Sequence, residues 1–251
     1  MCSVAKEFGN RLFFNAYKKN DQQSKKLLTN KMKDRILKPT GSRKRGNVMK
    51  KGEKRKLELL LIAYRMFLSR GYENTSVDAI IEEAKIAKGT FYYYFESKEH
   101  LLEEVISMMI EKEADAARQI LGTDIPVPQK IVAIISSLQP EPEEEVIENA
   151  LMRPENIVMH KKIKNRLIET VVPIVSEAVK EGVKEGIFDC KNIPERVRMI
   201  LVISTEVFDE GDFTKKDVEV FIDLAEKLFG AKAGTMSFIK KLIKMPKQNR
   251  S

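Results

Sequence analysis

The chain has 251 residues, of which 43% are hydrophobic and 33% are charged. This length and balance suit a protein of two modest domains and argue against wholesale disorder. No apolar run approaches the roughly 20 residues that cross a bilayer, and the N-terminus lacks the apolar core of a secretory signal, so we expect a cytoplasmic protein without a membrane span.

The charge is unevenly spread along the chain. Residues 1–56 hold 18 Lys and Arg against 4 Asp and Glu, whereas the remainder holds 27 basic and 33 acidic residues. A basic end on an acidic body is typical of a nucleic-acid contact surface, although a solubilising tail would carry the same charge. The cysteines, Cys2 and Cys190, and the histidines, His100 and His160, are isolated. The sequence therefore predicts no disulfide framework, no metal site and no cofactor.

Residues 1–48 differ from the rest of the chain. They combine Lys and Arg clusters with sparse apolar residues and a Lys38-Pro39-Thr40-Gly41-Ser42 break, which predicts a poorly ordered basic extension. The extension is either an arm that follows DNA phosphates or a translated leader ahead of Met49. We favour the leader and expect residues 1–48 to be dispensable.

The next segment is helical. Apolar residues recur at three- and four-residue steps between Leu57 and Leu68, and Gly71 ends this first helix. Ser76, or the threonine before it, can cap a short second helix, and residues 88–95 form a short third one. Ser97 caps a long helix that runs towards residue 121.

The two short helices, joined by Lys85-Ile86-Ala87, have the pattern of a helix-turn-helix, which holds its second helix in the DNA major groove. Phe91 and Phe95 are four residues apart and should face the core. One helix cannot bury all five aromatic residues of 91–95 in so small a domain, because its faces point all round. Some tyrosines must be exposed, where they can donate to phosphates and touch thymine methyl groups.

The run Lys88-Gly89-Thr90-Phe91-Tyr92-Tyr93-Tyr94-Phe95 resembles the recognition-helix signature of the TetR family of bacterial transcriptional regulators. The resemblance covers about residues 54–104, and the sequence that begins at Met49 looks like the natural start of such a chain. Further matches lie at Gly71-Tyr72, Thr75-Ser76-Val77, Ile80 and Ser97-Lys98-Glu99. The chain departs from the family at Lys85, where glycine is usual, at Ala87, where serine is usual, and at Tyr94, where histidine is common.

The resemblance implies a DNA-contact role for six residues: Lys88, Gly89, Thr90, Tyr92, Tyr93 and Lys98. Ser76 and Tyr94 are further DNA-contact candidates beside them. Lys85 should take a left-handed backbone conformation at some strain. Ala87 should leave the helix that follows it without a side-chain cap.

The family architecture implies an all-α fold in which residues 49–98 form the helix-turn-helix domain and 99–230 an effector-binding and dimerisation domain, followed by a basic tail, 231–251. Helices at about 194–210 and 214–229 each present one apolar face. We expect one face to complete the chain's own core and the other to form the seam of a four-helix dimer bundle. That second face comprises Val218, Phe221, Ile222, Ala225 and Phe229.

The function expected from these features is that of a homodimeric repressor, released from a pseudo-palindromic DNA operator by a small-molecule effector. Four methionines, Met108, Met109, Met152 and Met159, are either effector-lining or ordinary core residues, and no ligand residue is named. A regulator of the same fold that is controlled by a protein partner is the main alternative. An all-helical enzyme is remote, because the sequence has no glycine-rich phosphate loop and no nucleophile–base pair. A membrane-surface protein would rest only on the basic arm and tail.

Overall fold

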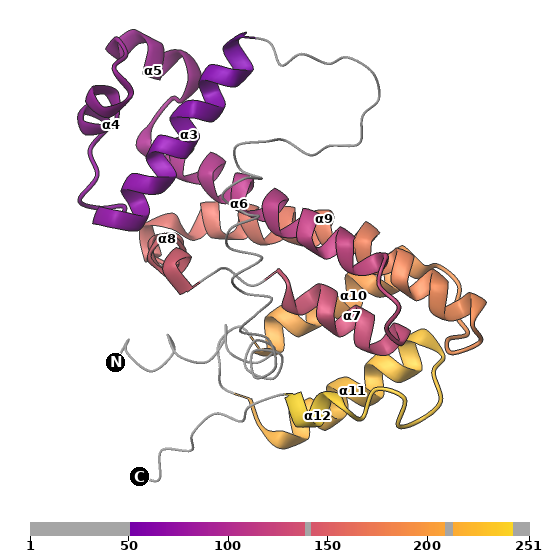
Figure 1. The fold of residues 1–251 in the computed structure, drawn as a ribbon. Helices are drawn as coiled ribbons and strands as arrows, with labels where there is room; N and C mark the ends of the chain where they lie inside the picture. The colour runs from indigo at the N-terminus through magenta and orange to yellow at the C-terminus, as the bar shows by residue number, and fades with distance from the viewer. Residues whose placement is uncertain (1–50, 139–141, 209–212, 243–251) are drawn as a thin grey trace, which may run out of the picture. The chain divides into compact units, whose positions relative to one another are not determined.

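The computed structural model describes residues 51–138, 142–208 and 213–242, and within these ranges the chain is helical and contains no strand. The all-α fold predicted from the sequence is confirmed. The predicted extension, residues 1–48, lies outside the described residues, as does the end of the predicted basic tail, 243–251. In chain order the helices are (Figure 1) α3 (Lys51–Arg70), α4 (Val77–Ala84), α5 (Lys88–Tyr94), α6 (Lys98–Leu121), α7 (Val127–Ser136), η3 (Pro142–Glu144), α8 (Glu145–Leu151), η4 (Pro154–Asn156), α9 (Ile157–Lys184), α10 (Ile193–Phe208), α11 (Lys215–Phe229) and α12 (Ile239–Leu242).

The chain divides into two compact units. The described part of the first, here called the head unit, lies within residues 48–119 and 137–173. The described part of the second, the C-terminal unit, lies within residues 120–136 and 174–251. Helices α6 and α9 each contribute to both units. The predicted boundary after residue 98 follows the helix-turn-helix rather than these units, and it stays a prediction.

Helix α3 ends as its sequence predicts. Its apolar stripe buries Leu59, Ala63 and Phe67 in the head unit. Gly71 follows at φ +80°, a left-handed conformation that glycine adopts easily, and its N–H donates to the Phe67 carbonyl. Asn74 Nδ2 donates to the carbonyl of the last helical residue at 3.0 Å. Carbonyls at the end of the helix that lack an intrahelical partner are thereby satisfied.

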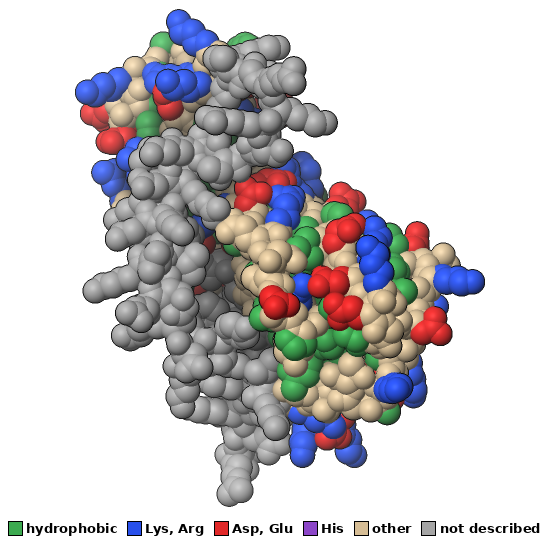
Figure 2. Space-filling view, turned by 45° about the vertical axis from the view of Figure 1, so that its right-hand side comes forward, with side chains coloured by type: hydrophobic (Ala, Val, Ile, Leu, Met, Phe, Trp, Pro, Cys, Tyr) green, Lys and Arg blue, Asp and Glu red, His purple; other side chains and the backbone are tan. Residues whose placement is uncertain are grey.

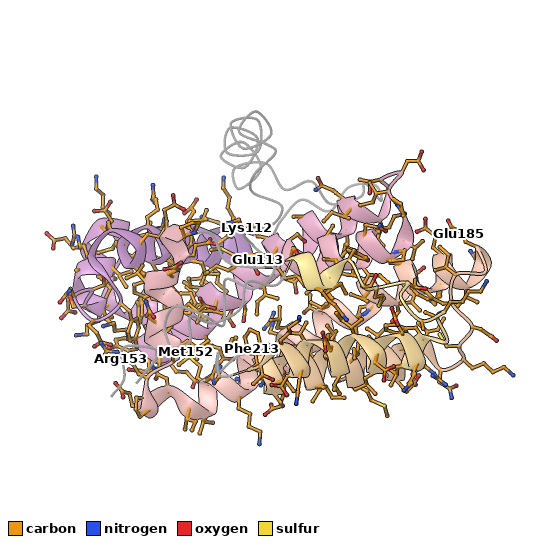
Figure 3. All side chains as sticks on the ribbon, turned by 90° about the horizontal axis from the view of Figure 1, so that it is seen from below. Lys112, Glu113, Met152, Arg153, Glu185 and Phe213 are labelled. Atoms are coloured by element: carbon orange, nitrogen blue, oxygen red, sulfur yellow. The ribbon has the colours of Figure 1, made fainter. Side chains whose placement is uncertain are left out.

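The core of the head unit joins α3, α4 and α5 to α6, α8 and α9. Helix α8 packs on α3 and contributes Ile147, which is fully buried. Met109 belongs to this core, and Met108 and Met159 pack against it, which favours ordinary packing roles for three of the four methionines considered as effector-lining residues. Met152, at the end of α8, is exposed (Figure 3).

Two features hold the C-terminal unit together: close packing at a glycine and an ion pair of a buried lysine. A Cβ at Gly182 would overlap the ring of Phe188, whose centroid lies 5.6 Å from that of Phe229. The Nζ of Lys130 is almost fully buried and donates to both carboxylate oxygens of Glu181, at 2.6 and 2.8 Å. This ion pair ties α7 to the second half of α9.

The predicted dimer seam on α11 is wrong. Val218, Ile222, Ala225 and Phe229 are all less than 5% exposed within a single chain. Phe221 is half-buried, and its ring packs edge-on against that of Phe208 at 5.0 Å. The apolar stripe of α11 therefore fills the core of its own unit. The large apolar side chains that α10 and α11 leave exposed lie on other faces: Met199, Val202 and Val220.

Candidate nucleic-acid interface

Helix α4 begins and ends with the local chemistry that a helix-turn-helix requires. Ser76 is its N-cap, and the serine hydroxyl accepts a hydrogen bond from the Ala79 N–H at 3.1 Å. Lys85 follows the last turn at φ 51°, in the left-handed region, as expected for a lysine at a position where glycine is usual. Arg55 of α3 donates to the Ala84 carbonyl at 3.3 Å, which fixes this end of α4 to α3.

Helix α5 is anchored in the core by two phenylalanine rings and exposes two tyrosine rings to solvent. Phe91 and Phe95 are completely buried, as predicted, and their centroids lie 5.6 Å apart. Tyr92 is 48% exposed and Tyr93 81% exposed. Ala87 occupies the N-cap position without a side-chain hydrogen bond, so the predicted missing cap is confirmed. The buried phenylalanines thus fix which side of α5 faces outward.

The remaining predicted contact residues on α5 lie around these tyrosines. Lys88 and Gly89 are exposed and Thr90 is half-buried. No heavy atom would lie within 4 Å of a Cβ at Gly89, so the chain's own packing does not require a glycine there. Lys88 makes an exposed ion pair with Asp78, at 3.4 Å. Tyr94 is half-buried, and a Cβ at Gly52 would lie 3.6 Å from its hydroxyl, so this tyrosine faces the start of α3.

Lys98 is positioned by groups that sequence reasoning did not connect to it. Its Nζ lies 4.1 Å from the centroid of the Tyr72 ring and donates to the Glu73 carbonyl at 3.4 Å. Tyr72 is buried, and its burial, followed by the nearby Glu99 carboxylate, raises the pKa of its phenol. The ring is therefore a neutral platform that holds the ammonium at the first position of α6, where the helix dipole also attracts anions.

A salt bridge ties this region to the end of α8. Arg153, labelled in Figure 3, pairs with Glu73 at 3.0 Å, and the Glu73 carbonyl is the group that accepts from Lys98. Sequence reasoning missed Arg153 because the two partners lie 80 residues apart. Figure 2 shows Lys and Arg side chains, with some Asp, Glu and hydrophobic ones between them, at the end of the head unit that carries α4 and α5.

Two further properties bear on the kind of site this is. The described part of the chain contains no group of three or more His, Cys, Asp and Glu side chains that could hold a metal ion. Within the same ranges, every helix is too short or too polar to cross a lipid bilayer. The exposed Tyr92, Tyr93 and Lys88 of α5 and the half-buried Lys98 of α6 offer hydrogen-bond donors and positive charge, which suit phosphates and base edges.

Two family models match the chain. Residues 59–105 match the model described as bacterial regulatory proteins, tetR family. Residues 143–231 match the model described as tetracyclin repressor-like, C-terminal domain. Together the two matches span more than half of the sequence. The chain belongs to the TetR family. The first match contains every residue of α5, and the second runs from η3 to the end of α11.

Curated proteins similar to this TetR-family chain are transcriptional regulators. An uncharacterized HTH-type regulator of Bacillus subtilis, YuxN, is 45% identical over 60 residues, which are 24% of this chain and 20% of that protein. The activator FasR of Mycolicibacterium smegmatis is 30% identical over 99 residues, 39% of this chain and 45% of that protein. The repressor KstR2 of the same species is 39% identical over 69 residues, 28% and 34% of the two chains. The matches thus span about a fifth to a half of these relatives.

Solved structures support the TetR-family fold over a longer stretch. RolR in complex with resorcinol has a TM-score of 0.52 and 17% identity, and the match covers 76% of this chain and 94% of RolR. A TetR-family transcriptional regulator from Mesorhizobium loti has a TM-score of 0.50 and 18% identity, over 72% and 96% of the two chains. At these identities the likeness concerns the fold.

Proposed function

We propose that the protein is a cytoplasmic DNA-binding transcriptional regulator that acts as a homodimer. The observation that carries this proposal is the construction of α5. Two fully buried phenylalanines hold the helix, while Tyr92 and Tyr93 stand exposed beside Lys88. The eight residues proposed to contact DNA are Ser76, Lys88, Gly89, Thr90, Tyr92, Tyr93, Tyr94 and Lys98. Residues 49–98 are proposed as the DNA-binding domain and 99–230 as the domain for effector binding and dimerisation.

A dimer with one head per chain should bind a pseudo-palindromic duplex, because its two-fold symmetry must be mirrored in the site. The test is selection of a duplex from a random library, followed by titration of the purified protein with the selected duplex and with its half-site. Affinity should fall with salt at a log–log slope of about −0.9 per neutralised phosphate. Absent or salt-insensitive duplex binding would overturn the proposal.

We propose that the exposed apolar residues of α10 and α11 form the dimer contact. Met199 is 56% exposed and Val220 65% exposed, although both lie on helices whose other faces fill a core. Aspartate at both positions should produce a folded monomer with much weaker operator binding, as seen by sedimentation and by titration. Glu195→Asp, an exposed change on α10 that keeps its charge, is the matched control. An unchanged dimer in the Met199→Asp, Val220→Asp variant would place the contact elsewhere.

The match of residues 143–231 to a repressor-like C-terminal domain supports control by a small-molecule effector of unknown identity. Control by a protein partner is the alternative. We favour a repressor, while noting that similar proteins include both the activator FasR and the repressor KstR2. A reporter gene behind the selected operator distinguishes repression from activation, and a metabolite panel added to the purified complex tests for release by an effector. The family match and the regulator relatives support a non-enzymatic role.

A further inference from the structure

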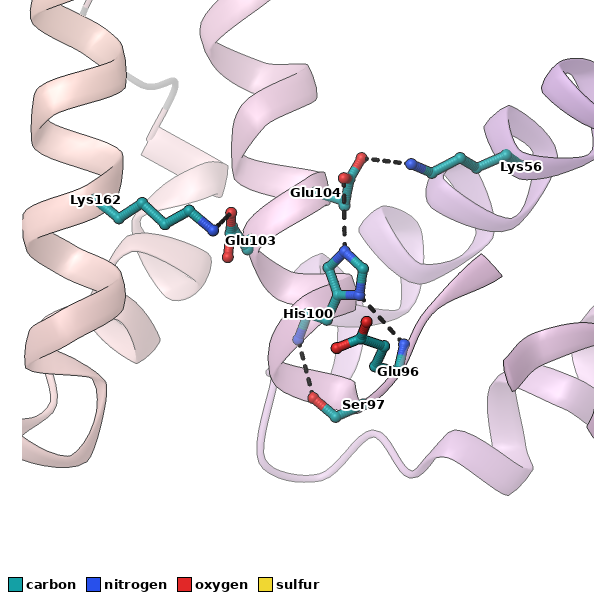
Figure 4. A network of polar contacts seen from close by, with 7 residues as sticks. All are labelled: Lys56, Glu96, Ser97, His100, Glu103, Glu104 and Lys162. Atoms are coloured by element: carbon teal, nitrogen blue, oxygen red, sulfur yellow. Dashed lines mark hydrogen bonds and ion pairs between the residues drawn. The ribbon is translucent and has the colours of Figure 1, made fainter. Parts of the chain in front are cut away.

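The turn between α5 and α6 is closed by a reciprocal pair of hydrogen bonds (Figure 4). The backbone N–H of His100 donates to the Ser97 hydroxyl at 3.1 Å. In return, Nδ1 of His100 accepts from the backbone N–H of Glu96 at 3.2 Å. This arrangement is similar to a capping box, in which the third helical residue accepts from the backbone N–H of the N-cap, except that the donor here is Glu96, one residue before the N-cap Ser97. Here a histidine takes the place of the usual Glu or Gln.

The hydrogen bond from Glu96 fixes the location of the imidazole proton. A ring nitrogen that accepts an N–H carries no proton, so the neutral ring carries its proton on Nε2. That nitrogen faces the Glu104 carboxylate of the same helix at 3.7 Å. A doubly protonated ring would turn Nδ1 into a second donor against the Glu96 N–H, and the bond would be lost.

Charged groups from three helices surround the histidine. Glu104 is bound by the Lys56 ammonium of α3 at 2.9 Å, and the charge of Arg166 on α9 also acts on it. Burial opposes ionisation of Glu104, but the Lys56 hydrogen bond and charge outweigh it and hold the pKa of that carboxyl below its usual range. The neighbouring Glu103 is paired with α9 through Lys162, at 2.5 Å. The carboxylate beside His100 is therefore ionised and held in place.

The backbone that His100 holds lies within the proposed DNA-contacting surface. Glu96 directly follows Phe95, the C-cap of α5, whose buried ring meets the histidine ring edge-on at 6.1 Å between centroids. Two residues after Glu96 comes Lys98, with its ammonium over Tyr72. A shift of this turn would move the end of α5 and the start of α6 together.

We infer that His100 is a positioning residue for DNA binding, whose neutral ring holds the α5–α6 turn and whose protonation releases it. The inference rests on the proposed function, because duplex affinity is its main readout. Protonation of Nδ1 would remove the acceptor of the Glu96 N–H, so protonation of the ring opens the turn. Electrostatic attraction alone predicts the opposite change in duplex affinity, because an added positive charge near DNA would strengthen binding.

The test compares duplex affinity at about pH 7.5 and about pH 5.5 for the wild type and three variants. His100→Gln supplies an uncharged acceptor, so it should match the wild type at the higher pH and keep that affinity at the lower one. The wild type should weaken about three- to tenfold on acidification, the effect of losing one intramolecular hydrogen bond. His100→Ala should be weak at both values. The only other histidine is the matched control, and His160→Gln should keep the wild-type pH profile.

Wild-type affinity that is unchanged or stronger at the lower pH would overturn the inference, as would a His100→Gln variant as weak as His100→Ala. If His100→Ala fails to fold, the duplex affinities of the wild type and of His100→Gln at the two pH values still test the inference. Failure of the proposed function is distinguishable, because the wild type would then bind no duplex at either pH. The ¹⁵N shifts of the His100 ring and hydrogen exchange at the Glu96 amide then test the bond directly. A protonated Nδ1 at the higher pH would refute it.

Discussion

The hydroxyl of Tyr64 donates to the carboxylate of Glu144 at 2.6 Å, and Lys112 approaches the same oxygen at 2.9 Å. Glu144 is 1% exposed, so this carboxylate from η3 joins α3 to α6 in the interior of the head unit (Figure 3 labels Lys112). A buried carboxylate is stable only while its partners compensate for its lost hydration. The three side chains therefore act as one structural unit.

Glu144→Ala should destabilise the protein by about 2–3 kcal/mol, less than the loss of a fully buried pair because Lys112 is partly exposed. Tyr64→Phe removes one hydrogen bond and should cost about 1 kcal/mol. Urea unfolding measures both variants. Glu143→Ala, an exposed neighbour of the buried carboxylate, serves as the control and should be close to neutral. Equal effects at the two glutamates would contradict the burial of Glu144 between α3 and α6.

The orientation of α5 predicts opposite effects on duplex binding and on stability for substitutions at two adjacent aromatic residues. Tyr92→Ala should weaken duplex binding and leave the melting temperature nearly unchanged, because the ring is half exposed. Phe91→Ala should cost about 3–5 kcal/mol of stability, as expected for a fully buried phenylalanine. Thermal unfolding and duplex titration of the same samples separate the two outcomes. If the tyrosine variant unfolds and the phenylalanine variant does not, α5 turns its tyrosine side toward the core instead of its phenylalanine side.

The turn of the helix-turn-helix carries backbone strain that a single substitution can relieve. Lys85 has φ 51°, so Lys85→Gly should stabilise the protein by about 1 kcal/mol. Asn192 has a similar φ of 53°, but asparagine tolerates this region, and Asn192→Gly should gain less. Urea unfolding without DNA provides the comparison. A destabilised Lys85→Gly variant would mean that the lysine side chain contributes more than its strained backbone costs.

The N-terminus of α11 makes stability depend on pH. Hydrogen bonds from the backbone and then the hydroxyl of Thr214 lower the pKa of Asp217 below its ordinary 3.8. The folded chain therefore binds fewer protons than the unfolded chain between the two pKa values. The contribution of Asp217 is complete above pH 3.8 and is lost as the pH falls through the folded-state pKa.

Asp217→Asn should accordingly be less stable than the wild type at about pH 6, and the difference should shrink below about pH 4. Denaturant unfolding at both pH values measures this change. Asp223→Asn, further along α11, is a comparison that lies outside the capping box. A difference that grows on acidification would contradict the assigned direction of the pKa shift.

Local signals in the sequence were sufficient to predict the helix-turn-helix. Ser76, Gly71 and Ser97 act through neighbours within a few residues, and the four-residue spacing of Phe91 and Phe95 fixes their face. The role of the α11 stripe could not be predicted, because an apolar face looks the same whether it fills its own core or meets a second chain. The position of Lys98 over Tyr72 and the bond from Glu96 to His100 depend on tertiary geometry, although Ser97 and His100 have capping-box spacing.

The three tyrosines of α5 also give the protein an intrinsic fluorescent probe. The chain contains no tryptophan and six tyrosines, and Tyr92, Tyr93 and Tyr94 are consecutive residues at the end of one short helix. Half of the tyrosines in the chain therefore lie on the helix that we propose contacts a duplex, and no tryptophan emission masks theirs. Quenching or polarisation of this intrinsic emission would report on that helix without any attached dye.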